Sequence, residues 1–128
     1  MKVGEDKEDN LAKVESYTEK LSLQGANLVV LPEMFNCPYE MGKFSDYAEK
    51  MPGKTTEKLG NLADRLNIHL IGGSIPEKED GSMYNTSPIF NPEGKLVARH
   101  RKNNLFDVNI PGEVVFRESD HFCAGSEH

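Results

Sequence analysis

The chain has 128 residues, of which 37% are hydrophobic and 28% are charged, and its formal net charge is −6. This length suits one domain or part of a larger one, and the composition excludes outright disorder. The acidic balance, without a long Lys/Arg cluster, argues against nucleic-acid binding, and no apolar segment is long enough to span a bilayer.

The first predicted element is an amphipathic helix. Residues 1–9 are mostly charged and are expected to be poorly ordered. Asp9 or Asn10 can cap a helix that runs to about Gln24. Apolar residues recur in this segment at three- and four-residue spacing, which forms a stripe that needs a sheet to lie against. They are Leu11, Val14, Tyr17 and Leu21.

A short apolar run follows the helix and ends in a lone carboxylate. Residues 28–31 are continuously apolar, which predicts a strand covered on both faces. Pro32 cannot donate a hydrogen bond to a neighbouring strand and therefore ends this one. Glu33 is thus placed at the carboxyl end of a strand, where open α/β sheets usually bind ligands. The alternative is an ordinary solvated glutamate at a strand exit.

The segment after Glu33 predicts a loop and a second long helix. Residues 34–51 carry aromatic side chains without clean periodicity, so we expect a loop followed by a short helix. Thr55 or Thr56 then opens a helix that runs to about Leu66, with its leucines on one face.

Three strands are predicted in the second half of the chain. Residues 68–75 are expected to form one strand that passes through Gly72–Gly73, where another backbone or a ligand can approach closely. Residues 83–90 and 95–100 predict a hairpin, because the four residues between them have the preferences of a type I turn. Residues 101–128 show no clear element.

The predicted order is helix, strand, helix and three strands. This is an α/β pattern in which no strand precedes the first helix and no element closes the end. We therefore interpret residues 1–128 as part of an α/β domain.

A second candidate site residue lies near the end of the last predicted strand. Lys102 closely follows residues 95–100, so a lysine and Glu33 both emerge at strand ends. In such a pair the glutamate takes a proton from a nucleophile or water, and the lysine stabilises an oxyanion. From these residues alone, a structural ion pair or two solvated side chains are the alternatives.

Several separate motifs, in this order and spacing, resemble the nitrilase superfamily of carbon–nitrogen hydrolases, and within it the omega-amidase branch. The resemblance implies a partial α-β-β-α sandwich, so that residues 1–128 form a partial carbon–nitrogen hydrolase domain without its first strand. It also implies a Glu-Lys-Cys triad. The motifs are residues 31–39, 70–77, 84–86, 101–112 and 116–119.

The resemblance assigns roles to three residues. Glu33 matches the general base, Lys102 the oxyanion-stabilising lysine, and Glu118 a second glutamate that supports the lysine and positions substrate. The nucleophile has no counterpart, because Cys123 is too close to Lys102 and Cys37 has no catalytic role in the family pattern. Both are expected to be free thiols, buried or partly buried. Residues 1–128 alone are therefore expected to be inactive.

The implied activity is hydrolysis of terminal amides of small dicarboxylic acids, for example 2-oxoglutaramate to 2-oxoglutarate and ammonia. No cofactor is expected, and no metal, since the four histidines lack the spacing of a zinc site. The implied partners are a small-molecule amide substrate and, in the complete protein, a second copy in a homodimer. We expect a cytoplasmic location, with a mitochondrial one as the alternative. Two further hypotheses stay open: another nitrilase-superfamily amidase or nitrilase, and a non-catalytic truncated product.

Overall fold

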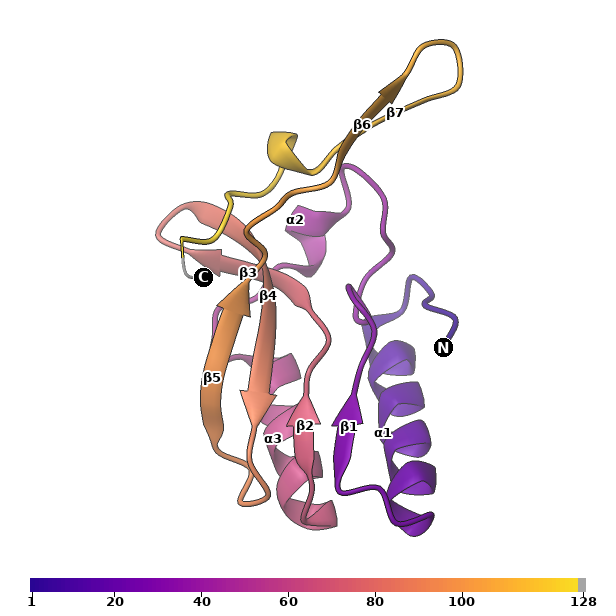
Figure 1. Ribbon diagram of the computed structural model, residues 1–128, viewed down its shortest axis with the longest axis vertical. Helices are drawn as coiled ribbons and strands as arrows, with labels where there is room; N and C mark the ends of the chain where they lie inside the picture. Colours follow the sequence, from indigo (N-terminus) through magenta and orange to yellow (C-terminus); the bar gives the residue numbers. More distant parts are fainter. Residues whose placement is uncertain (127–128) are drawn as a thin grey trace.

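The computed structural model describes residues 1–126, in which two long helices pack on a five-stranded sheet and a separate hairpin follows (Figure 1). This mixed α/β architecture confirms the predicted fold class. The elements are α1 (Lys7–Leu23), β1 (Leu28–Val30), α2 (Phe44–Tyr47), α3 (Lys54–Leu66), β2 (His69–Ile71), β3 (Ile75–Glu79), β4 (Ser82–Phe90), β5 (Leu96–Arg101), β6 (Asp107–Ile110), β7 (Val114–Arg117) and the 3-10 turn η1 (Glu118–Asp120).

Strand β4 organises the sheet, because it pairs with three other strands. Its last residue, Phe90, pairs with Leu70 of β2 on one side and with Leu96 of β5 on the other. The first half of β4 pairs with β3, also antiparallel, and β1 extends the sheet by pairing in parallel with β2. The predicted hairpin of β4 and β5 is confirmed, since the Gly94 N–H donates to the Asn91 carbonyl at 2.9 Å across its turn.

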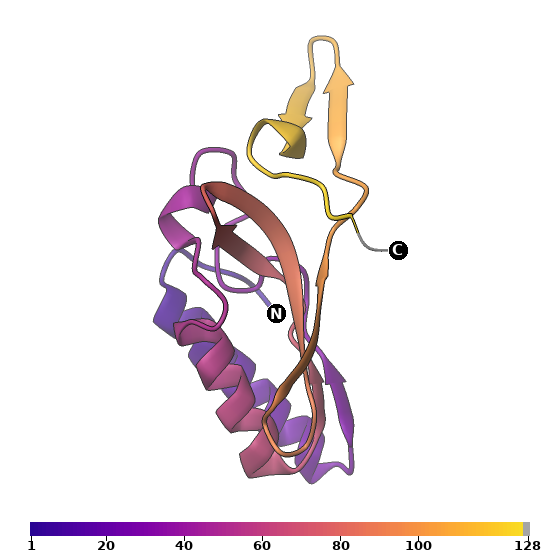
Figure 2. The ribbon, with the colours of Figure 1, turned by 90° about the vertical axis from the view of Figure 1, so that its left-hand side faces the viewer.

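Helices α1 and α3 lie side by side against one face of the sheet (Figures 1 and 2). Leu11 and Val14 of α1 and the leucine-bearing face of α3 meet the inward side chains of the strands, so one continuous apolar core lies between the two layers. Tyr17 and Leu21, the other members of the predicted α1 stripe, are 53% and 43% exposed, so the prediction that they lie against the sheet is wrong. The buried residues of this core are Leu11, Val14, Val29, Leu31, Phe35, Leu59, Leu62, Ala63, Ile68, Leu70, Ile75 and Phe90.

Helix α1 begins earlier than its sequence predicts. The Asp6 carboxylate accepts a hydrogen bond from the Asp9 N–H at 3.0 Å and so caps the helix. The prediction that residues 1–9 are poorly ordered is therefore wrong for residues 7–9, which form the first helical turn. Asn10 is not the cap: it is buried and exchanges two 2.8 Å hydrogen bonds with the Gly4 backbone.

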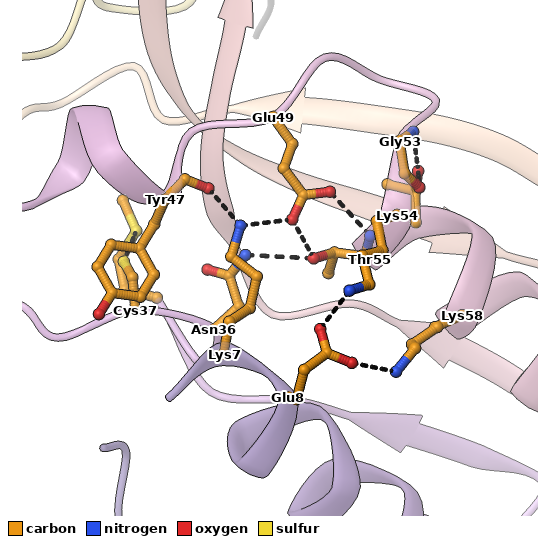
Figure 3. Close-up of polar contacts among 12 residues, drawn as sticks. Lys7, Glu8, Asn36, Cys37, Tyr47, Glu49, Gly53, Lys54, Thr55 and Lys58 are labelled. Carbon is orange, nitrogen blue, oxygen red and sulfur yellow. Dashed lines mark hydrogen bonds and ion pairs between the residues drawn. The ribbon is translucent and has the colours of Figure 1, made fainter. Parts of the chain in front are cut away.

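Polar side chains tie the start of α1 to the start of α3 (Figure 3). Lys7 Nζ lies 2.8 Å from Glu49 Oε1, and the other oxygen of Glu49 accepts a hydrogen bond from the Thr55 N–H at 2.8 Å. Glu8 on α1 also pairs with Lys58 on α3 at 2.7 Å. These contacts fix the loop between β1 and α3 against both helices.

The strand predicted over residues 68–75 is wrong, because the structure has two strands there, β2 and β3. They are separated at Gly72–Ser74, where Gly73 has a φ of +56°. A Cβ atom on Gly73 would lie 2.0 Å from the Pro32 carbonyl oxygen, so only glycine fits at this crossing. The close approach of another backbone, predicted for this glycine pair, is confirmed, and it ends the pairing of β2.

The chain after Arg101 forms structure that the sequence does not predict. Strands β6 and β7 build a short hairpin around Pro111–Gly112 that extends away from the main sheet (Figure 1). Each strand has four residues, too few for a clear alternation of polarity to show in the sequence. Residues 127–128 lie outside the described part of the chain.

Only one face of β1 is covered, so the prediction of a strand buried on both faces is wrong for the described residues. Val29 packs in the core, whereas the side chains of Leu28 and Val30 are 53% and 62% exposed. The helices cover the face on which Val29 lies, and no element of residues 1–126 lies over the opposite face of the sheet (Figure 2). We call this opposite side the open face.

The open face is expected to make the 128-residue chain self-associate, because exposed apolar sheet surface is a site of association. Leu28→Lys should raise the concentration at which dimers and larger species form in sedimentation velocity. Leu23→Lys is the control, since Leu23 is also exposed but lies at the end of α1. Equal effects of the two substitutions would show that the open face does not drive association.

Candidate active site

The structure brings Glu33, Lys102 and Glu118 together from three distant parts of the chain. Lys102 Nζ lies 3.0 Å from Glu33 Oε1 and 2.9 Å from Glu118 Oε2. Glu33 lies beyond the end of β1, Lys102 directly follows β5, and Glu118 directly follows β7. In Figure 1, β1 and β5 both run upward and end at the same end of the sheet. The lysine therefore bridges two carboxylates.

The position of Glu33 depends on a tight crossing of two chain segments. Pro32 ends the strand, and its carbonyl lies against Gly73. The next residue, Met34, has a φ of +49°, and its N–H donates to Ser74 Oγ at 3.1 Å. Glu33 thus lies between two residues that the segment after β2 holds in place, and this aims its side chain away from the helices.

Lys102 is held by backbone pairing beyond the end of its strand. Its N–H donates to the Asn85 carbonyl at 2.8 Å, and its own carbonyl accepts from the Gly125 N–H at 3.0 Å. Burial alone lowers the pKa of Lys102, but the hydrogen bonds to Glu118 and Glu33 outweigh burial and raise this pKa above its ordinary value. The ammonium is therefore charged at neutral pH.

Glu118 is a buried carboxylate with all of its acceptor positions used. Its side chain is 0% exposed and accepts from Lys102, from the Tyr39 hydroxyl, from the Phe106 N–H at 2.5 Å, and from Asn85 Nδ2 at 3.5 Å. Burial alone raises the pKa of Glu118, but the donors, with the Tyr39 hydroxyl first, outweigh burial and hold this pKa below its ordinary value. Because its acceptor positions are all used and it is ionised, Glu118 is better suited to hold the lysine in place than to accept a proton.

Glu33 differs from Glu118 in having an oxygen available. Its Oε1 accepts from Lys102 at 3.0 Å and from Asn85 Nδ2 at 2.7 Å. Within residues 1–126 no hydrogen bond reaches Oε2, and the side chain is 50% exposed. Of the two carboxylates, Glu33 is therefore the one that can take a proton from a bound group.

Glu33 and Lys102 line a pocket on the open face of the sheet. The pocket has a volume of about 310 Å³, which is in the range of a small-molecule site. Its wall is apolar along the strands and polar near the two charges. The lining residues are Val30, Leu31, Glu33, Ile71, Gly73, Ser74, Asn85, Ser87, His100 and Lys102.

Two further residues belong to this site but receive no role from the sequence. Asn85 is buried and its amide reaches both Glu33 and Glu118, and Tyr39 donates its hydroxyl to Glu118. The sequence marks both only as members of the motifs over residues 31–39 and 84–86. Their position in those motifs is the one signal that could have identified them.

Both cysteines are free, as predicted, but they differ in exposure. Cys37 is fully buried beside Met34, with 3.9 Å between the two sulfur atoms, and burial raises the pKa of its thiol to about 12. Cys123 is exposed, so the prediction that it is buried or partly buried is wrong. It lies in the extended segment after η1, where few neighbours cover it.

The two thiols are expected to react at very different rates with iodoacetamide at about pH 8, because the thiolate is the reactive form. Cys123 should be alkylated within minutes, and Cys37 should be protected until the protein unfolds. Peptide mass spectrometry with and without urea measures both rates. Equal labelling in the native protein would contradict the buried position of Cys37.

Known proteins match this chain along almost its whole length. A family model for carbon–nitrogen hydrolases matches residues 2–127. The omega-amidase NIT2 of Mus musculus is 47% identical over 125 residues, which cover 98% of this chain and 45% of the relative. The NIT2 of Danio rerio is 46% identical over 123 residues, which cover 96% and 44%. The chain therefore spans slightly less than half the length of these curated relatives.

A solved structure matches the fold as well. The crystal structure of Saccharomyces cerevisiae Nit3, described as a member of branch 10 of the nitrilase superfamily, superposes with a TM-score of 0.82 at 34% sequence identity. The match covers 98% of this chain and 45% of the Nit3 chain.

Proposed function

Because the chain belongs to the carbon–nitrogen hydrolase family, as its motifs predict, we propose that the complete protein is an amidohydrolase for terminal amides of small dicarboxylic acids. The observation that carries this proposal is the bridge of Lys102 between Glu33 and Glu118 beside an open pocket. The name omega-amidase of the relatives supports the substrate class.

The proposed reaction proceeds through a thioester on a cysteine that the complete protein supplies. Glu33 Oε2 takes the proton of the thiol, and the thiolate attacks the amide carbon. Lys102 Nζ donates a hydrogen bond to the oxygen on which negative charge develops. Glu33 then passes the proton to the nitrogen, and ammonia leaves. Water, deprotonated by Glu33, attacks the thioester and releases the carboxylic acid and the thiol.

Glu118 keeps the lysine in place during this cycle. Its Oε2 lies 2.9 Å from Lys102 Nζ, and its donors hold its pKa below the ordinary value and so keep it ionised.

The homodimer and the cytoplasmic location stay predictions, as does the absence of a cofactor. No helix within residues 1–126 has the length and apolar composition to cross a membrane.

The test is ammonia release by the complete protein on a panel of substrates. The panel holds an omega-amide of a dicarboxylic acid, an amide of a monocarboxylic acid, a nitrile and an N-carbamoyl amino acid. We expect the omega-amide to have the highest kcat/KM. A preference for another substrate would place the protein in another branch of the superfamily, and no turnover at all would favour a non-catalytic product.

A further inference from the structure

A second buried carboxylate lies outside the site. Glu77 on β3 is 1% exposed, and three donors fill its oxygens. Thr86 Oγ1 donates to Oε2 at 2.7 Å, Arg99 Nη1 to Oε1 at 2.6 Å, and Arg101 Nε to Oε2 at 2.8 Å. Glu77 therefore connects β3 to both β4 and β5 through side chains.

The second arginine of this network is held from two further directions. Arg101 Nη2 lies 2.6 Å from Glu79 Oε2, and the guanidinium lies 3.8 Å from the centre of the Tyr84 ring. Because the planar guanidinium of Arg101 stacks on the Tyr84 ring and its N–H groups donate to two carboxylates, its orientation is fixed. Since Arg101 is the last residue of β5, this orientation fixes the end of that strand.

Two of the three partners of Glu77 are chain neighbours of the residues that hold Glu33. Thr86 and Arg101 face each other across the β4–β5 ladder. Asn85 directly precedes Thr86, and Lys102 directly follows Arg101. Successive side chains of a strand point to opposite faces of the sheet. Thr86 and Arg101 therefore point to the helix side, with Glu77, while Asn85 and Lys102 point to the open face.

We infer that Glu77 is a positioning residue for the site on the other face of the sheet. By holding Thr86 and Arg101, it sets the register and direction in which Asn85 and Lys102 reach Glu33. The inference rests on the proposed function, because it assigns Glu77 a part in placing Lys102 for catalysis.

A purely stabilising role explains the network less well. Replacing a buried ion-pair network by apolar side chains of similar volume is often neutral or stabilising. Unlike an apolar cluster, the network fixes the orientation of its side chains, since each oxygen of Glu77 has a fixed donor. Placement matters in catalysis, because a misplacement of about 1 Å can cost about 100-fold in rate.

The test compares Glu77→Gln with Glu79→Gln in the complete protein. Glu79 contacts the same two arginines but is 39% exposed and lies farther along β3 from the site, which makes it a matched control. Glu77→Gln should lower kcat for the omega-amide by about 100-fold with KM changed less than about threefold. Glu79→Gln should leave both constants within about twofold.

A second readout does not depend on activity. Within residues 1–126 the charged groups paired with Lys102 are Glu33 and Glu118, so the pKa of Lys102, followed by NMR of its side-chain nitrogen, reports its distance from them. Glu77→Gln should move that pKa down towards the ordinary lysine value, and Glu79→Gln should leave it unchanged.

The inference is wrong if Glu77→Gln folds and has the same kcat and the same Lys102 pKa as Glu79→Gln. If Glu77→Gln does not fold, Thr86→Val takes its place under the same criteria, since it removes one donor from Glu77. A wild type without amidase activity would refute the proposed function, while the pKa comparison would still decide the role of Glu77.

Discussion

Replacing Lys102 by alanine is expected to abolish turnover and to destabilise the protein at the same time. The loss of a single oxyanion donor costs about 3–4 kcal/mol of transition-state stabilisation in other enzymes. The same substitution leaves the fully buried Glu118 without its counter-charge. Breaking a buried ion pair from one side costs about 3–5 kcal/mol, and we expect the lower end because Tyr39 and the Phe106 N–H still donate to Glu118.

The destabilisation by Lys102→Ala should depend on pH in a defined direction. The pKa of Glu118 is held below its ordinary value, so its ionisation stabilises the protein above that ordinary value, and this stability is lost as the pH falls through the lowered pKa. The pKa of Lys102 is raised, so its contribution is present below about pH 10.4 and is lost as the pH rises through the raised value. The difference between wild type and variant should therefore be largest near neutral pH.

Urea unfolding at several pH values measures this difference. Lys95→Ala serves as the control, because Lys95 is an exposed lysine in the turn between β4 and β5. A loss of stability that is the same at about pH 3 and at about pH 7 would contradict the pairing of Lys102 with Glu118.

Glu33→Gln is expected to remove activity without unfolding the protein. Glutamine keeps the oxygen that accepts from Lys102 and Asn85 but cannot take a proton. General-base catalysis contributes about 10²–10⁴-fold, so kcat should fall by about that factor. Because Glu33 is half exposed, the free energy of unfolding should change by less than about 1 kcal/mol.

The measurement is kcat for the omega-amide together with urea unfolding, with Glu93→Gln as an exposed glutamate for comparison. An active Glu33→Gln protein would show that Glu33 is a structural partner of Lys102 and not the base.

Local sequence patterns place two of the three charged residues at strand ends, but they cannot show that these residues lie close together in space. The apolar run over residues 28–31 with Pro32 places Glu33 at a strand end, and the strand over 95–100 does the same for Lys102. Strands β1 and β5 are not neighbours, because β2 and β4 lie between them. Pairing between distant strands leaves no mark in local periodicity, so their meeting depends on the whole sheet.

Glu118 could be identified only from its family motif. It follows β7, a strand that the sequence does not predict, and its neighbours in space come from three other segments. Asn85 was missed for a related reason, since a polar residue within a strand has the same pattern whether it is solvated or bonded to two carboxylates. The open face was missed because a continuous apolar run does not say whether one or both faces are covered.

The most direct test of the catalytic account is rapid-quench mass spectrometry of the complete protein mixed with an omega-amide. The wild type should carry the acyl group of the substrate as a thioester on one cysteine at early times, with release of ammonia. Glu33→Gln should show this adduct at a rate lower by about 10²-fold or more. Acylation of Glu33→Gln at the wild-type rate would contradict the assignment of Glu33 as the base in the Lys102 cluster.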